Sequence, residues 1–205
     1  MTDVQLRALL DEVGARHERL CPRQVLGVRI GLHAGELLGL EVPRPDKRLL
    51  AFVETDGCFA DGVSVASGCW VGRRTLRVLD FGKAAAVFVD THTQQAVRVS
   101  PHPAARERAA RIAPTASSRW HAYLAGYAEL PASALLRSQP VVLTTPLDAI
   151  LGEPGVRVEC LRCGEEIMNH REIRVGGRSL CAGCAGGAYY VGTDLGVSTP
   201  VSMGA

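Results

Sequence analysis

The chain has 205 residues, of which 47% are hydrophobic and 21% charged, so it can bury a core and falls between one large domain and two small ones. Its formal net charge of +2 is too small for a general nucleic-acid partner, because binding a phosphate backbone needs a concentrated basic face. No stretch resembles a signal peptide or reaches the roughly 20 apolar residues of a membrane span. We expect a cytoplasmic protein without a membrane partner, whose thiols stay reduced unless they bind metal or do chemistry.

The first elements predicted along the chain are two helices. Residues 3–14 carry apolar side chains at helical spacing, and Pro22 suits the first turn of a second helix over residues 22–39, with Cys21 at or beside its N-cap. Glycine in a helix costs about 1 kcal/mol relative to alanine, so a repeated glycine needs a compensating close contact. We expect packing within the subunit rather than across a homodimer, the alternative, for the ridge Gly27, Gly31, Gly35 and Gly39.

Short strands and further helices follow. Three successive strands separated by turn signals indicate an antiparallel meander, and helices packed against one sheet give an α+β fold. Aromatic residues on one face of the last helix are expected in the core. The expected strands are 48–54, 74–81, 84–90 and 96–99, and the expected helices are 58–67, 103–112 and 117–129.

Proline spacing and cysteine spacing divide the chain. We predict an α+β domain over residues 1–140, and a connection with little regular structure, punctuated by prolines, that includes a linker over 141–156. A small cysteine module is predicted over 157–190, and a loosely held tail over 191–205.

The four C-terminal cysteines form two CxxC pairs separated by 17 residues, 164 to 180. Four thiolates complete a closed tetrahedral shell, which is how structural zinc is held. Iron in a rubredoxin-like site and a redox dithiol are the alternatives to zinc. The acidic and basic residues of this module nearly balance, which favours a scaffold or docking role over DNA binding. The predicted zinc ligands are Cys160, Cys163, Cys181 and Cys184.

The N-terminal cysteines are candidates for a reactive or metal-binding site. His17 and Cys21 are four residues apart, so in helical geometry both can face one ion. Cys58 falls at a predicted helix start, where the helix dipole is expected to lower its pKa. Asp61 follows three residues later. The alternative is that these cysteines are small buried hydrophobic residues.

Lysine is rare in this chain. Lys47 and Lys83 are its two lysines, and the other cations are arginines. A compact ammonium is not interchangeable with a guanidinium, so Lys83 is a candidate functional residue, although a GC-rich genome also explains the composition.

Several motifs together resemble the FmdE family, named for the E subunit of formylmethanofuran dehydrogenase. They are His17-Glu18-Arg19-Leu20-Cys21-Pro22, Leu26-Gly27-Val28-Arg29, Val53-Glu54-Thr55-Asp56-Gly57-Cys58-Phe59-Ala60-Asp61, Gly68-Cys69 and Gly82-Lys83. The two CxxC pairs are similar to the zinc-binding extension of many members.

The resemblance implies an α+β domain, often dimeric, with a metal pocket built from His17, Cys21 and Cys58. The chain departs from the family pattern at Glu18, Arg19 and Arg23, where a glycine, a second histidine and a glycine are usual. These changes weaken the metal site or convert it to one that binds an anion. Trp70 replaces a smaller residue and is expected to fill part of the pocket.

The function predicted is a metal-binding FmdE-like protein with zinc in the module and a second transition metal in the pocket. Cys21, Cys58 and Lys83 are the candidate catalytic residues, with Cys69 a bystander, for a reaction on a small molecule tied to formylmethanofuran dehydrogenase-type one-carbon metabolism. The alternative is a non-catalytic assembly subunit that docks on a dehydrogenase partner through its zinc module.

Overall fold

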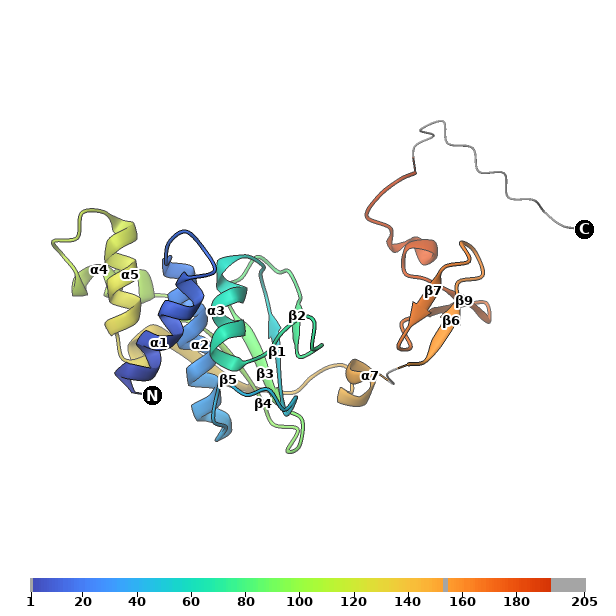
Figure 1. Cartoon of the computed structure of the whole chain (residues 1–205), viewed down its shortest axis with the longest axis horizontal. Helices are drawn as coiled ribbons and strands as arrows, with labels where there is room; N and C mark the ends of the chain where they lie inside the picture. Colours follow the sequence, from blue (N-terminus) through green and yellow to red (C-terminus); the bar gives the residue numbers. More distant parts are fainter. Residues whose placement is uncertain (1, 153–154, 193–205) are drawn as a thin grey trace, which may run out of the picture. The chain divides into compact units, whose positions relative to one another are not determined.

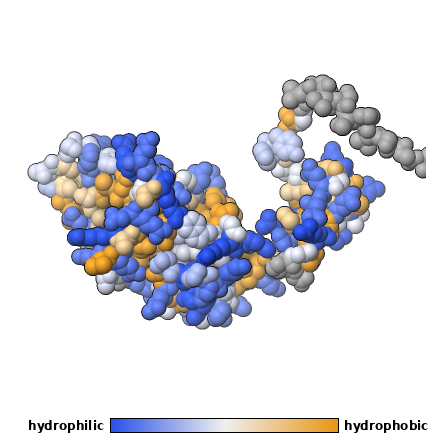
Figure 2. Space-filling view, viewed as in Figure 1, coloured by the Kyte–Doolittle hydropathy of each residue, from blue (hydrophilic) through white to orange (hydrophobic). Residues whose placement is uncertain are grey.

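The computed structural model describes residues 2–152 and 155–192 (Figure 1). The chain divides into two compact units, Met1–Leu147 and Asp148–Ala205, and each is described by itself. Among the described residues, no helix is long and apolar enough to cross a membrane. On the face of the first unit seen in Figure 2, hydrophilic residues predominate and apolar residues gather in small groups.

The first unit combines a five-stranded sheet with helices, which confirms the α+β class. Its helices are α1 (Asp3–Gly14), α2 (Pro22–Leu38), α3 (Cys58–Ser67), α4 (Ala105–Ile112), α5 (Arg119–Glu129) and α6 (Ala132–Leu135). Its strands are β1 (Leu49–Val53), β2 (Leu76–Val78), β3 (Ala86–Asp90), β4 (Ala96–Pro101) and β5 (Leu136–Val141). Helices α1, α2 and α3 lie on one side of the sheet (Figure 1).

The strand order is β2-β1-β3-β4-β5, and it corrects the predicted meander. Strands β3 and β4 form the expected antiparallel hairpin, but β2 pairs with β1, in parallel, and not with β3. Helix α3 connects β1 to β2, and a helical crossover is the connection that parallel neighbours require. The turn after β2 therefore carries the chain around the end of β1 instead of closing a hairpin.

Strand β5 and helix α6 lie in the stretch that was expected to have little regular structure. Pro140 sits in β5 opposite Val97 of β4. Proline cannot donate to a strand ladder, but it is tolerated at a sheet edge. Because β5 is an edge strand, the proline that argued against a strand is compatible with one here.

The glycine ridge of α2 is used inside the subunit. A Cβ atom at Gly27 would lie 2.3 Å from the carbonyl oxygen of Phe59, and one at Gly62 would lie 2.3 Å from that of Gln24. At Gly31 the nearest atom would be the Ala66 Cβ, at 2.8 Å. Helices α2 and α3 therefore touch closely at Gly27 and Gly31, as expected for packing within the subunit, and their N-termini are drawn together. Gly35 instead packs against Leu40 and Val42, and Gly39 is the C-cap of α2, where a Cβ atom would meet nothing within 4 Å.

The second unit begins near α7 (Leu147–Leu151) and consists of two short antiparallel hairpins and a helical turn. The hairpins pair β6 (Arg157–Glu159) with β7 (Glu166–Met168) and β8 (Ile173–Val175) with β9 (Arg178–Leu180). A π-helical turn follows at Gly183–Gly187. Cys160 and Ile167 are the buried hydrophobic residues in the described part of this unit, so its apolar core is minimal.

Candidate metal centre and adjoining cavity

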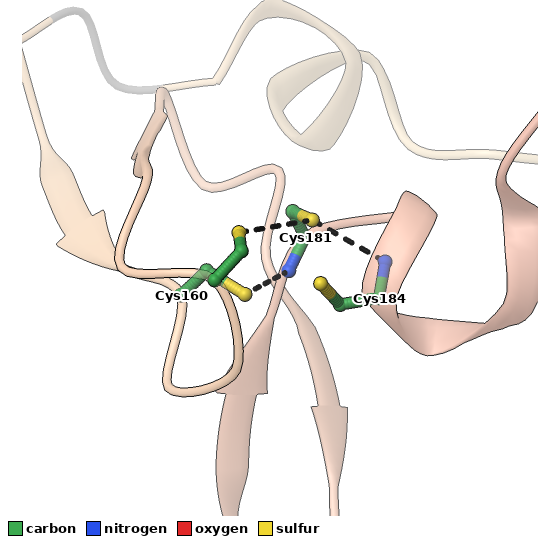
Figure 3. Close-up of side chains that lie close together, drawn as sticks. Cys160, Cys181 and Cys184 are labelled. Carbon is green, nitrogen blue, oxygen red and sulfur yellow. Dashed lines mark hydrogen bonds between the residues drawn. The ribbon is translucent and has the colours of Figure 1, made fainter. Parts of the chain in front are cut away.

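The four C-terminal cysteines converge on one point. Cys160 directly follows β6 and Cys181 directly follows β9, while Cys163 lies in the turn before β7 and Cys184 in the π-helical turn. Their sulfur atoms all lie within 4.8 Å of one another. Figure 3 shows the side chains of Cys160, Cys181 and Cys184 turned toward a common centre.

Backbone geometry places these sulfurs. The Cys160 N–H donates to the Glu165 carbonyl and the Gly164 N–H donates to the Cys160 carbonyl, both at 2.9 Å. Gly164 has φ +73°, a conformation that glycine adopts readily. The Leu161 N–H donates to the Ser179 carbonyl at 3.0 Å and thereby links the two hairpins. The tight turn between β6 and β7 thus presents two sulfurs to the pair that follows the second hairpin.

The four thiols differ in pKa. Backbone N–H groups of Cys163 and Cys181 donate to the Cys160 sulfur, the latter at 3.3 Å, and lower the pKa of Cys160 to about 6. Hydrogen bonding to the Cys181 sulfur, together with burial, raises the pKa of Cys184 to about 12. One sulfur is therefore prepared as a thiolate while another retains its proton until a cation displaces it.

The residues fit a structural zinc ion. Zinc–sulfur bonds of about 2.3 Å in a tetrahedron place the sulfurs about 3.8 Å apart. The Cys163 and Cys181 sulfurs are 4.0 Å apart, so small shifts suffice. In the residues that the structure describes, this cluster is the one group of three or more His, Cys, Asp or Glu side chains placed to hold an ion.

In the first unit, two predicted site cysteines come together at adjoining helix ends. Cys21 is the N-cap of α2 and Cys58 is the first residue of α3. Both are half-buried, and the Cys21 thiol lies near enough to Cys58 to influence its pKa. The close approach at Gly27 and Gly62 is what allows these two N-termini to meet.

The pKa of Cys58 differs from the prediction. Desolvation by burial and the neighbouring Cys21 thiol raise it above its ordinary value, whereas the helix start was expected to lower it. The helix dipole is outweighed because burial and a second thiol both disfavour the charged form.

The imidazole of His17 is engaged by the carboxylate of Asp61. Its Nε2 lies 2.9 Å from the Asp61 carboxylate, and both side chains are partly exposed. The assignment of His17, Cys21 and Cys58 to one metal therefore stays a prediction, and it requires the imidazole to exchange Asp61 for the ion.

A cavity of about 730 Å³ adjoins the thiol pair. It lies between the start of α2, the segment entering β3, the end of β4, and helices α4 and α5. Cys21 and Lys83, both predicted as catalytic, line this cavity, and neither His17 nor Cys58 does. The aromatic residues of α5 expected in the core also line it, namely Trp120, Tyr123 and Tyr127.

The chain segment around the end of β1 brings Lys83 to the cavity. The backbone N–H groups of Phe81 and Lys83 donate to the Glu54 carbonyl, at 2.9 and 3.0 Å. The Glu54 carboxylate in turn accepts two hydrogen bonds from Arg98, each at 2.6 Å. Glu54 thus fixes the loop and neutralises one of the arginines at the cavity wall.

Two buried polar residues that sequence reasoning missed hold the site in place. Gln24 is fully buried, and its side chain accepts from the Cys21 N–H at 2.6 Å and donates to the Val13 carbonyl at 3.2 Å. Arg29, 2% exposed, donates to the Tyr127, Ala128 and Leu130 carbonyls at 2.6–2.8 Å. Gln24 has a recognisable signal, since glutamine three residues after an N-cap is typical of a capping box.

The remaining sequence candidates lie elsewhere. Cys69 is buried and its thiol donates to the Leu49 carbonyl at 3.3 Å, so it belongs to the core. Trp70 lines a separate pocket of about 290 Å³ and does not fill the larger cavity. Arg19 lies 5.4 Å from the ring centroid of Trp120, which extends the basic surroundings of the cavity.

Comparison with known proteins decides the family. Residues 16–137, more than half of the chain, match the family model described as FmdE, molybdenum formylmethanofuran dehydrogenase operon. The chain belongs to the FmdE family. Residues 154–190 match the prokaryotic dksA/traR C4-type zinc finger, in agreement with the four-cysteine cluster. This FmdE chain is thus a metal-binding protein with a zinc-finger module.

Two individual proteins are similar to this FmdE chain. An FmdE-like protein of the tungsten formylmethanofuran dehydrogenase type from Syntrophus aciditrophicus shares its fold, with a TM-score of 0.59, 22% identity and coverage of 91% of this chain and 95% of that one. A probable S-adenosyl-L-methionine-binding protein from Archaeoglobus fulgidus is 39% identical over 98 residues, 46% of this chain. The match spans 27% of the length of that relative.

Proposed function

We propose that this FmdE-family chain binds a small molecule beside a transition metal held by Cys21, Cys58 and His17, with structural zinc in the C-terminal module. The observation that most supports this proposal is the position of Cys21. Its thiol neighbours Cys58, and the same residue lines the 730 Å³ cavity. A ligand in that cavity would therefore lie next to an ion bound by the thiol pair.

Each residue has a distinct part in this proposal. Cys21 and Cys58 supply thiolates, the preferred ligands of soft metals, and His17 supplies an imidazole after leaving Asp61. A bound ion would provide Lewis-acid polarisation of the substrate. Lys83, on the cavity wall, would orient a negatively charged group of that substrate. The names of the family and of the Syntrophus relative connect this chemistry with formylmethanofuran dehydrogenase-type one-carbon metabolism.

Metal analysis of the purified protein tests the proposal. Wild-type protein is expected to hold more than one ion per chain. A Cys160→Ser/Cys163→Ser variant should lose the module ion and keep the pocket ion, and a Cys21→Ser/Cys58→Ser variant should do the reverse. A wild-type protein with a single ion that survives the Cys21/Cys58 change would refute the N-terminal metal.

A second candidate function is assembly of a dehydrogenase through the zinc module. Apolar side chains exposed on the module favour it, because such residues on a small domain often contact a partner. These are Leu161, Met168, Ile173, Val175, Tyr189 and Tyr190. Co-purification with a molybdenum or tungsten dehydrogenase, lost in a Tyr189→Ser/Tyr190→Ser variant that retains its zinc, would support docking. Retention of the complex in that variant would argue against these residues as the contact.

A further inference from the structure

We propose that the ligand of the 730 Å³ cavity is a small organic anion with a flat, unsaturated body. This inference rests on the proposed function, since it names the class of ligand for the same site. The observation behind it is the chemistry of the residues that line the cavity, which combine cations, neutral hydrogen-bond donors and aromatic rings.

The wall of the cavity is positively charged. Its charged residues are all cations, Arg23, Lys83, Arg98 and Arg106, and no aspartate or glutamate among the described residues lines the cavity. Arg98 is neutralised by Glu54. The other three form no ion pair within the described parts of the chain. Uncompensated positive charge in a concave site concentrates anions.

The nitrogen-bearing side chains of the cavity wall offer hydrogen-bond donors. The His102 Nδ1 accepts from the Ala104 N–H at 3.0 Å, so in the neutral ring the proton resides on Nε2, which is left as a donor. His102 therefore adds a donor to the guanidinium groups of Arg23 and Arg106 and the ammonium of Lys83. A ligand rich in acceptor oxygens satisfies this set, and a cationic ligand meets no carboxylate in it.

Aromatic rings of α5 form the apolar part of the cavity wall. Tyr123 and Tyr127 stack on each other along α5, with ring centroids 5.8 Å apart and planes inclined by 11°. Trp120, one turn earlier, also lines the cavity. The volume, about 730 Å³, belongs to the range of organic-ligand sites rather than of single inorganic ions. The aromatic wall therefore suits a flat body, and the cations suit its acidic groups.

A matched pair of fluorescent probes tests this inference in the full-length protein. Anilinonaphthalene sulfonate carries one negative charge, whereas N-phenylnaphthylamine has nearly the same ring system and no charge. We expect the sulfonate to bind at least about tenfold more tightly, because one charge-assisted hydrogen bond contributes that much. Naphthalene disulfonate should displace it competitively.

Substitutions locate the binding. Arg23→Gln and Lys83→Gln should each weaken sulfonate binding about tenfold and leave the neutral probe unchanged. Both residues are exposed, so the variants should fold, which thermal unfolding verifies. Arg7→Gln is the matched control, since Arg7 is an exposed α1 residue outside the cavity. Its effect should be negligible.

The probe experiments test the anion site independently of the proposed pocket metal. Equal affinity for the two probes, or sulfonate binding unaffected by both cavity substitutions, would overturn the anion assignment even if the pocket metal is present. Sulfonate selectivity that persists in a Cys21→Ser/Cys58→Ser variant would support the anion site whether or not the wild-type pocket holds a metal, and the ion count of the wild-type protein decides the metal separately.

Discussion

Substitution of Gly27 by alanine should force α2 and α3 apart. The new Cβ would lie 2.3 Å from the Phe59 carbonyl oxygen, and ordinary contact begins at 3.4 Å, so the helices must separate by up to about 1 Å. Overpacking of this kind costs about 3 kcal/mol, and better helix propensity returns about 1 kcal/mol. We therefore expect a net loss of about 2 kcal/mol, or roughly 4–8 °C in Tm.

Urea unfolding followed by tryptophan fluorescence measures this loss, because both tryptophans, Trp70 and Trp120, belong to the first unit. Gly14→Ala is the matched control. Gly14 is also helical, and a Cβ there would meet Leu20 at an ordinary 3.7 Å, so this change should be neutral or slightly stabilising. The same Gly27→Ala protein should show slower crosslinking of Cys21 to Cys58 by a short bifunctional thiol reagent. Unchanged stability and unchanged crosslinking would refute the reasoning.

Three further predictions concern the buried charges and the module. Arg29→Met should destabilise the first unit by about 3 kcal/mol, since it removes the charged donor from three carbonyls at the end of α5; a loss in urea unfolding below about 1 kcal/mol would contradict this. The hydrogen bonds from Arg48 hold the pKa of the Asp90 carboxyl well below its usual range. The free energy of unfolding of wild type should therefore exceed that of Asp90→Asn by about 3 kcal/mol at neutral pH. The difference should shrink as pH falls below about 4, because the carboxylate then becomes protonated. A difference independent of pH would contradict a stabilising ion pair between Arg48 and Asp90. Removal of zinc by a strong chelator should unfold the module, whose core is minimal, and leave the tryptophan-detected transition in place. Persistence of dispersed module NMR signals without metal would show that zinc is dispensable for its fold.

Elements with local signals were predictable from the sequence. The expected helix over 58–67 coincides with α3, and the expected helix over 22–39 differs from α2 by one residue. Both are bounded by features that act within a few residues: Pro22 opens α2, and glycines with positive φ end both helices, at Gly39 and Gly68. The cysteine cluster was predictable for the same reason, since CxxC spacing is a property of one tight turn.

Features that depend on distant segments were not predictable. The place of β2 in the sheet follows from the crossover through α3, and no residue of β2 itself encodes its partner. The aromatic face of α5 was expected in the core, and Tyr127 is buried there with Tyr123 packed against it. Trp120 and Tyr123 also line a cavity, because α2, held by Arg29, sets the position of α5. Burial of Arg29 and the cationic character of the cavity wall emerge only when these elements are assembled.

Anomalous scattering from crystals of the metal-loaded protein, recorded on both sides of each metal absorption edge, tests the proposed metal pocket most directly. We predict a zinc peak at the centre of Cys160, Cys163, Cys181 and Cys184, and a second metal peak bonded to the sulfurs of Cys21 and Cys58. A single peak in the module, with the Cys21 and Cys58 thiols unligated and His17 still on Asp61, would contradict the pocket.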